Sequence, residues 1–219
     1  MMRKLSLVTV AIFILCSSLY AQNTDSTNKR TDSTKTGRPL SAMDQYNKGE
    51  ALLDKGDYAN ALPFYEAAVK INPAFAAAWN GMGLCFCRTD QPDLALEAYN
   101  KSLQINPRDI TTLLGIPEVY EVQKKYDAAL AAYQQIVDTY PAYPDTYYAR
   151  GRLYTYYKID LEKGLSDMCK AYNLYSTMNS PYVKDAEKSI GYIYGEMKRA
   201  GNEDEFNKIL IDNNISTSN

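Results

Sequence analysis

The chain has 219 residues, of which 46% are hydrophobic and 23% are charged, and its formal net charge is −2. These proportions are typical of a globular protein, and a slightly acidic surface has no general attraction for nucleic acid phosphates. Histidine is absent from the sequence, which excludes a Ser-His or Cys-His nucleophile pair and a histidine metal ligand.

Residues 1–21 have the pattern of a signal peptide. Two basic residues precede an apolar run over residues 5–15, and Ala21 stands just before a candidate cleavage point. The alternatives are an uncleaved membrane anchor, for which the run is short against the about 20 residues that a span needs, and a lipid-modified Cys16. Cleavage would leave 22 basic against 26 acidic residues, a net charge of −4. We therefore expect an exported protein that contacts a membrane only if this segment is retained or lipidated.

Residues 22–41 form a polar linker that we expect to be disordered, because it has almost no apolar surface to bury. The tetrapeptide TDST occurs at residues 24–27 and again at residues 31–34. Its DST triplets resemble an O-glycosylation signal of exported Bacteroidetes proteins, so the linker is either a carrier of a glycan or a plain flexible tether. The Tyr-Ala-Gln ending of the signal peptide is similar to that group too. This resemblance implies the periplasm or cell envelope of a Gram-negative bacterium.

From Ala42 onward the sequence repeats with a period of 34 residues. A fixed interval of this size, held by several independent columns, marks stacked structural repeats. The columns are Pro73, Pro107 and Pro141; Ala61, Ala95 and Ala129; Tyr65, Tyr99 and Tyr133; Leu52, Phe86, Tyr120 and Tyr154; and Gly49, Gly83 and Gly151, the last interrupted by Pro117.

Each period is predicted to be an antiparallel pair of helices, here called helix A and helix B. Apolar residues recur at three- and four-residue steps over Ala42–Asp54 and Tyr58–Lys70, and a Gly-Asp turn separates the two runs. Gly49 falls where the helix axes must approach closely, and the large Tyr65 fills the space beside it. One pair cannot bury its apolar face alone, so neighbouring pairs complete a shared core.

The repeated residues resemble the tetratricopeptide repeat consensus. The matching positions are Gly49, Leu52, Gly56, Tyr58, Ala61, Tyr65, Ala68 and Pro73 in the first repeat, Trp79, Gly83, Phe86, Ala95, Tyr99 and Pro107 in the second, and Tyr120, Tyr126, Ala129, Tyr133 and Pro141 in the third. The resemblance implies an all-α fold, a right-handed superhelical solenoid, with repeats over residues 42–75, 76–109 and 110–143 of a domain that spans residues 42–219.

The register slips after the third repeat. The small residue expected at Lys163 comes one position late, at Gly164, so a single inserted residue is predicted in the YYKIDLE turn of a fourth repeat over residues 144–180. Gly191 follows Gly151 by 40 residues, which predicts about five further residues in the next connection. Residues 182–212 are then a degenerate fifth repeat, whose second helix is polar enough to cap the array.

The family resemblance places a ligand groove along the helices A, where peptides or protein segments are held. The predicted groove residues are Tyr46, Glu50, Asn80, Leu84, Arg88, Leu114, Glu118, Glu121, Tyr148, Arg152 and Tyr156. They depart from the family's clamp for a C-terminal carboxylate, because Tyr46 and Glu50 replace its first Lys and Asn. Glu118 and Glu121 would also repel an anionic tail, which leaves Arg88 and Arg152 as isolated cations in the groove.

The chain has 20 tyrosines, which fall into two groups. The repeated column at Tyr65 is expected in the core, as is Trp79 at the consensus tryptophan position. Tyr46, Tyr148 and Tyr156 fall on the groove side, where each either contacts a ligand or packs between repeats.

Two further features of the sequence each allow two interpretations. Pro117 stands inside the third helix A and is expected to bend it, either as a tolerated kink or as a kink that opens the groove. Cys85, Cys87 and Cys169 are either small buried residues with one partly exposed thiol among them, or they include a thiol, Cys87 or Cys169, that does redox work or forms a bridge to a partner.

These patterns favour a non-catalytic adaptor that binds a protein or peptide partner, with no cofactor, metal or nucleic acid. The alternative is a glycan-binding envelope protein that uses the groove tyrosines. An enzyme is not predicted, because the sequence lacks histidine, a cluster of metal ligands and a glycine-rich phosphate loop.

Overall fold

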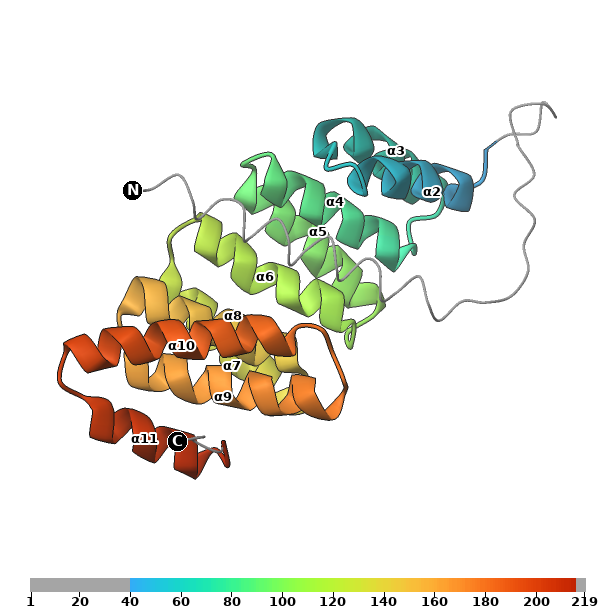
Figure 1. The fold of residues 1–219 in the computed structure, drawn as a ribbon. Helices are drawn as coiled ribbons and strands as arrows, with labels where there is room; N and C mark the ends of the chain where they lie inside the picture. Colours follow the sequence, from blue (N-terminus) through green and yellow to red (C-terminus); the bar gives the residue numbers. More distant parts are fainter. Residues whose placement is uncertain (1–39, 216–219) are drawn as a thin grey trace. The chain divides into compact units, whose positions relative to one another are not determined.

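The computed structural model describes residues 40–215, and all regular structure within that range is helical (Figure 1). Its elements are α2 (Ala42–Leu53), α3 (Tyr58–Ile71), α4 (Ala76–Arg88), α5 (Pro92–Ile105), α6 (Ile110–Val122), α7 (Tyr126–Thr139), α8 (Pro144–Leu153), the π-helical turn η3 (Tyr154–Lys158), α9 (Leu161–Thr177), α10 (Val183–Arg199) and α11 (Glu203–Asp212). The predicted signal peptide over residues 1–21, with Cys16, and nearly all of the linker over residues 22–41 lie outside the described residues.

The chain divides into two compact units, Met1–Gly115 and Ile116–Asn219, and the division falls within α6. Each unit has a hydrophobic core of its own, around Tyr65 in the first and around Met168 in the second. Helix α6 continues through Pro117, so the proline does not end the helix. The bend expected at that residue stays a prediction.

Local sequence signals set the ends of the first helix pair. The hydroxyl of Ser41 accepts a hydrogen bond from the Asp44 N–H at 3.1 Å, and the Asp44 carboxylate accepts one from the Ser41 N–H at 2.8 Å, which closes a capping box. Gly56 takes the left-handed φ of +73° that the following turn requires. Asp57 then caps α3 by accepting from the Asn60 N–H at 3.4 Å. The observed α2 and α3 confirm the two helices predicted for the first repeat.

The repeated tyrosines of unit 1 are pressed between glycines of two successive helices A. A Cβ atom added to Gly49 or to Gly81 would lie 2.8 Å or 2.6 Å from Cε1 of Tyr65. One repeat later, Gly83 and Gly115 approach the ring of Tyr99 in the same way. The second glycine of each pair, at positions 81 and 115, also obeys the 34-residue interval, and the sequence analysis missed that column.

The register slip in the fourth repeat coincides with a π-helical turn. Residues Tyr154–Lys158 form η3 directly after α8, and a π-helical turn accommodates one more residue than an α-helical turn. Ile159 ends it in the left-handed region at φ +54°. The glycine that comes one position late, Gly164, is needed there, because its Cβ would lie 2.3 Å from Oγ1 of Thr155. The predicted single-residue insertion therefore has a structural counterpart at the end of this helix A.

The last three helices differ in length from those of the first repeats. Helix α9 has 17 residues against 14 in α3, α5 and α7, so it takes up part of the predicted lengthening. Helix α10 also has 17 residues and packs along α9, whereas α11 has 10 (Figure 1). Phe206, Ile209 and Leu210 bury the inner side of α11 against Ile193 and Met197 of α10.

Candidate partner-binding face

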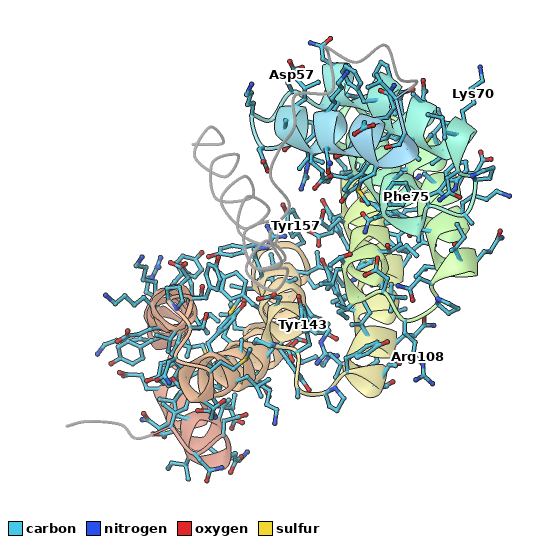
Figure 2. The ribbon with its side chains drawn as sticks, turned by 90° about the vertical axis from the view of Figure 1, so that its right-hand side faces the viewer. Asp57, Lys70, Phe75, Arg108, Tyr143 and Tyr157 are labelled. Atoms are coloured by element: carbon cyan, nitrogen blue, oxygen red, sulfur yellow. The ribbon has the colours of Figure 1, made fainter. Side chains whose placement is uncertain are left out.

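The first two predicted groove residues, Tyr46 and Glu50, belong to a hydrogen-bonded cluster in unit 1. The Tyr65 hydroxyl donates to Oε1 of Glu50 at 2.5 Å. The Tyr46 ring lies 5.8 Å from that of Tyr65 and 5.0 Å from that of Phe75, which Figure 2 labels. Burial raises the pKa of Glu50, and hydrogen bonds from Tyr65 and Tyr46 oppose the rise only in part. Tyr46 therefore packs against neighbouring rings, which is the second of the two alternatives given for it in the sequence analysis.

Asn80 is held by the following repeat. Its Nδ2 lies 2.9 Å from Oγ1 of Thr111, 2.8 Å from Oγ1 of Thr112 and 3.3 Å from Oδ2 of Asp109. Because an amide has only two N–H groups, this network occupies the donors of Asn80. Its role in unit 1 is thus to join α4 to the start of α6.

Two other predicted groove residues of unit 1 differ from the expectation. Leu84 is only 8% exposed, so it is part of the core and offers no accessible groove contact. Arg88 is half-buried at the end of α4 and interacts within the chain, so it is not an isolated cation. Leu114, on α6, is half-buried.

Arg152 of unit 2 is not an isolated cation either. Its Nη2 donates to Oε2 of Glu121 at 3.1 Å, and the hydroxyl of the buried Tyr133 donates to Oε1 of the same carboxylate at 2.7 Å. Burial lowers the pKa of Arg152, but Glu121, Tyr133 and Glu118 more than offset this, so the pKa is raised. The negative charge of Glu121 is compensated inside the protein, which weakens the repulsion expected from Glu118 and Glu121 together.

The same arrangement recurs in three repeats. Tyr65 donates to Glu50, Tyr133 to Glu121, and Tyr175 to Asp145. In each case a tyrosine of helix B reaches a carboxylate of its own helix A. Of these carboxylates, Glu50 and Glu121 were predicted groove residues, and both are hydrogen-bonded to a core tyrosine.

Tyr148 and Tyr156 have different surroundings. Tyr148 is half-buried, meets the ring of Tyr175 edge-on at 6.5 Å and lies between two core clusters, so it packs between helices. Tyr156, on η3, is 40% exposed, and its ring lies 5.3 Å from that of Tyr192 on α10. Burial raises the pKa of Tyr156, with further contributions from Tyr192 and Tyr148.

Tyr192 and Tyr157 are accessible aromatic residues that the sequence analysis missed. Tyr192 is 44% exposed and follows Gly191 just as Arg152 follows Gly151, so aligning the fifth helix A on the fourth would have found it. Tyr157 (Figure 2) is 39% exposed and stacks on Tyr126 at 4.6 Å with an interplanar angle of 27°. The sequence did not indicate Tyr157, because the groove residues were predicted from regular α-helical phase and the π-helical turn departs from that phase.

The three cysteines within residues 40–215 are buried and unbridged. Burial raises the pKa of the Cys85 thiol and of the Cys169 thiol to about 12, so neither thiol readily forms the reactive thiolate. Cys87 is also buried. These positions favour the packing alternative over a redox or bridging role.

Within residues 40–215, no group of three Cys, Asp or Glu side chains is arranged to hold a metal ion. In the same part of the chain, none of the helices has the length and apolar character that crossing a membrane would require.

Comparison with known proteins identifies the repeats. A family model described as "Tetratricopeptide repeat" matches residues 46–110, and a second with the same description matches residues 118–143. The chain contains tetratricopeptide repeats. With the helical structure, this confirms the predicted all-α helical-repeat solenoid.

Three known proteins are similar to parts of this chain. The chain is 27% identical over 81 residues to a BBSome complex member BBS4 homolog of Drosophila melanogaster, which covers 37% of this chain and 17% of the relative. It is 27% identical over 104 residues to the peroxisomal targeting signal receptor of Yarrowia lipolytica, covering 47% and 17%. It is 31% identical over 97 residues to tetratricopeptide repeat protein 37 of Xenopus laevis, covering 43% and 6%. The chain thus spans less than a fifth of the length of these relatives.

Among solved structures, MamA from Desulfovibrio magneticus RS-1 has the same fold. The TM-score is 0.59 at 20% identity, and the likeness covers 78% of this chain and 92% of that one.

Proposed function

We propose that this protein is a non-catalytic scaffold that holds a segment of a partner protein against the helix-A side of its tetratricopeptide repeats. The observation that carries the proposal is the exposed pair Tyr156 and Tyr192, on two successive helices A of unit 2. Amphipathic aromatic side chains of this kind are enriched where proteins bind one another. By their names, one similar protein is a receptor for a targeting signal and another is a member of a complex, and both names fit such a role.

A glycan is the second candidate ligand, because a sugar ring can also lie on an exposed tyrosine. Sugar hydroxyls need free polar side chains as well. The carboxylates of Glu121 and Glu196, near this tyrosine pair, are already paired with Arg152 and Arg199. This pairing favours a protein segment over a glycan.

We place the scaffold in the periplasm or cell envelope, as a proposal that rests on the sequence of residues 1–21. Cell fractionation of the native host, followed by N-terminal sequencing, tests it. The expected mature chain begins at Gln22. A cytosolic protein with an intact first segment would contradict this placement.

Site-specific photo-crosslinking tests the binding face. A benzoylphenylalanine residue is introduced at Tyr156 or at Tyr192, and at the exposed Lys170 of α9, a helix B, as the control. We expect a partner protein to be crosslinked from the first two positions and not from the third. A synthetic peptide that covers the crosslinked segment should then compete with the partner. Crosslinking only from Lys170, or none from any position, would contradict the proposed face.

A further inference from the structure

We propose that unit 2 binds the surface of an anionic lipid bilayer through the turns that join helix A to helix B in the third and fourth repeats. These turns and the residues beside them, 122–127 and 157–163, are here called the turn edge, and both segments belong to unit 2. The inference goes beyond the proposed function and does not depend on it. It does not depend on residues 1–21 either, so it applies to a mature chain that begins at Gln22.

Two contacts hold the two turns side by side. Tyr126, at the start of α7, stacks on Tyr157 of η3 at 4.6 Å, and Oδ1 of Asp127 lies 2.8 Å from Nζ of Lys158. Figure 2 labels Tyr157 and Tyr143, which stand at opposite ends of the helix formed by α8 and η3. Tyr157 is thus at the end where helix A turns into helix B, and the two turns share that end of unit 2.

Ile159 is the residue of this edge that folding does not explain. Its side chain is 78% exposed, more than that of any other large hydrophobic residue within residues 40–215. Its φ of +54° lies in the left-handed region, which is strained for a β-branched residue. The corresponding residues of the other turns with positive φ are Gly56, Asp90, Lys124 and Gly201, none of which has a large apolar side chain. An apolar side chain that strains the backbone and gains no burial in the fold points to burial against something outside the chain.

The neighbours of Ile159 have the composition of a membrane interface. Val122 and Tyr157 are exposed, and a tyrosine, with its apolar ring and polar hydroxyl, suits the boundary between acyl chains and headgroups. Lys124 and Lys125 are exposed and form no ion pair with any residue that the structure describes. Lysines of this kind are attracted to lipid phosphates, while apolar side chains beside them enter the layer beneath.

The local charge favours an anionic surface although the protein as a whole is acidic. The turn edge has four lysines against three acidic residues, a net charge of +1, whereas the described chain has 18 basic against 24 acidic residues, a net charge of −6. Two of the lysines pair with Asp127 and Asp160. Lys124, Lys125 and Glu162 remain outside these pairs. An anionic membrane therefore attracts this edge and repels the acidic remainder, which orients the protein.

A bilayer fits this edge better than a second copy of the chain. In a symmetric pair the edge would face itself, which would bring Lys124 and Lys125 of one copy towards those of the other. A bilayer offers phosphates to the lysines and an apolar layer to Ile159, and it needs no pocket shaped for a protruding side chain.

Vesicle co-sedimentation tests the inference. The mature chain from Gln22 onward is mixed with vesicles of three parts phosphatidylethanolamine to one part phosphatidylglycerol, and separately with vesicles of phosphatidylcholine alone. We expect binding to the anionic vesicles that added salt weakens, and binding to the neutral vesicles that is at least about tenfold weaker. No binding to the anionic vesicles, or equal binding to both kinds, would overturn the inference.

Two variants remove the two attractive parts of the edge separately. Lys124→Glu/Lys125→Glu reverses the unpaired charges, and Ile159→Asn replaces the apolar side chain with one that accepts a positive φ more readily. Each should weaken binding to the anionic vesicles about tenfold or more. Thermal melting should show that Ile159→Asn is no less stable than the wild type. Unchanged vesicle binding in either variant would contradict the assignment to this edge.

Matched controls carry the same changes elsewhere in unit 2. Lys170→Glu/Lys184→Glu alters the charge equally at exposed positions of α9 and α10, and Ile211→Asn removes an exposed isoleucine of α11. Both should leave vesicle binding unchanged. Losses equal to those of the turn-edge variants would show that binding follows overall charge or apolarity, and the turn edge would then be rejected as the site.

A protein partner at the same edge gives a different result. A benzoylphenylalanine at Ile159 should crosslink to lipid when the protein is bound to the anionic vesicles. A protein crosslinked from this position in envelope extract, together with no vesicle binding, would overturn the lipid inference and make the turn edge a protein interface. Absence of a partner crosslinked from Tyr156 or Tyr192 would contradict the proposed function alone, since vesicle binding requires no partner protein.

Discussion

Thr112 and Thr146 occupy equivalent positions of two helices A, 34 residues apart, and both are fully buried. The hydroxyl of Thr112 lies 3.0 Å from Oγ of Ser102 and 2.8 Å from Nδ2 of Asn80. The hydroxyl of Thr146 has no hydrogen-bond partner within residues 40–215, since Ile136 stands where the earlier repeat has Ser102. A buried hydroxyl without a partner costs free energy.

This difference predicts opposite effects for the same substitution. Thr112→Val leaves Asn80 and Ser102 with one partner fewer and should lower the free energy of unfolding by about 1–3 kcal/mol. Thr146→Val removes an unsatisfied group of nearly the same shape and should leave stability unchanged or raise it by about 1 kcal/mol. Urea unfolding followed by circular dichroism measures both. Equal losses at the two positions would show that the two hydroxyls are equally satisfied.

Glu50 gives a prediction about pH. Its pKa is raised from 4.5 in the folded protein, chiefly by burial, so the folded state holds this proton more tightly than the unfolded state does. The contribution of Glu50 to stability is therefore greatest below pH 4.5 and is lost as the pH rises through the folded pKa.

Glu50→Gln should accordingly be more stable than the wild type at pH 7, and the difference should shrink as the pH falls through the raised folded pKa of Glu50 towards 4.5, where the carboxyl group takes up its proton. Fluorescence of Trp79, the only tryptophan of the chain, reports unfolding of unit 1. Glu97→Gln, at an exposed position of α5, is the control and should show no such trend. A stability gain that does not change with pH would contradict the assignment to ionisation of Glu50.

At the scale of the helices, the repeat interval predicted packing partners within the core, but not the contacts that depend on neighbouring helices. The columns at Tyr65 and Gly49 are direct packing partners, so the interval in the sequence reflects a contact in the core. The position of a residue around the axis of helix A could not show that Leu84 is buried or that Glu121 pairs with Arg152. Both facts depend on neighbouring helices. Tyr157 became accessible through a π-helical turn that no regular phase describes.

The contact of Tyr65 with Gly81 predicts a steric cost. A Cβ at Gly81 would lie 2.6 Å from the tyrosine ring, which is buried and cannot move aside freely. Gly81→Ala should lower the free energy of unfolding by about 1–3 kcal/mol, as overpacking does. Gly195→Ala, in open space on α10, is the matched control and should raise it by about 0.5–1 kcal/mol. Urea titrations by circular dichroism compare the two, and a loss of stability at Gly195 would contradict the open space described there.

At the scale of the whole chain, stability in repeat proteins is a sum of local terms, since each repeat contacts only its neighbours. The two units differ in what holds them. Unit 1 depends on tyrosines packed against glycines, whereas unit 2 contains a buried ion pair in which Arg150 donates to both oxygens of Asp167 at 2.8 Å and 2.7 Å. Arg150 also donates to Gln134 at 2.5 Å, which joins α7, α8 and α9.

Removing one partner of this pair should destabilise unit 2 before unit 1. Asp167→Ala leaves the buried Arg150 uncompensated, and the expected loss is about 3–5 kcal/mol. Because Trp79 lies in α4, two repeats away, its fluorescence transition in urea should shift less than the transition seen by circular dichroism. The double variant Arg150→Met/Asp167→Leu removes both charges and should recover most of the lost stability. Equal shifts of both transitions in Asp167→Ala would mean that the two units unfold as one, and the local account of stability would then be wrong.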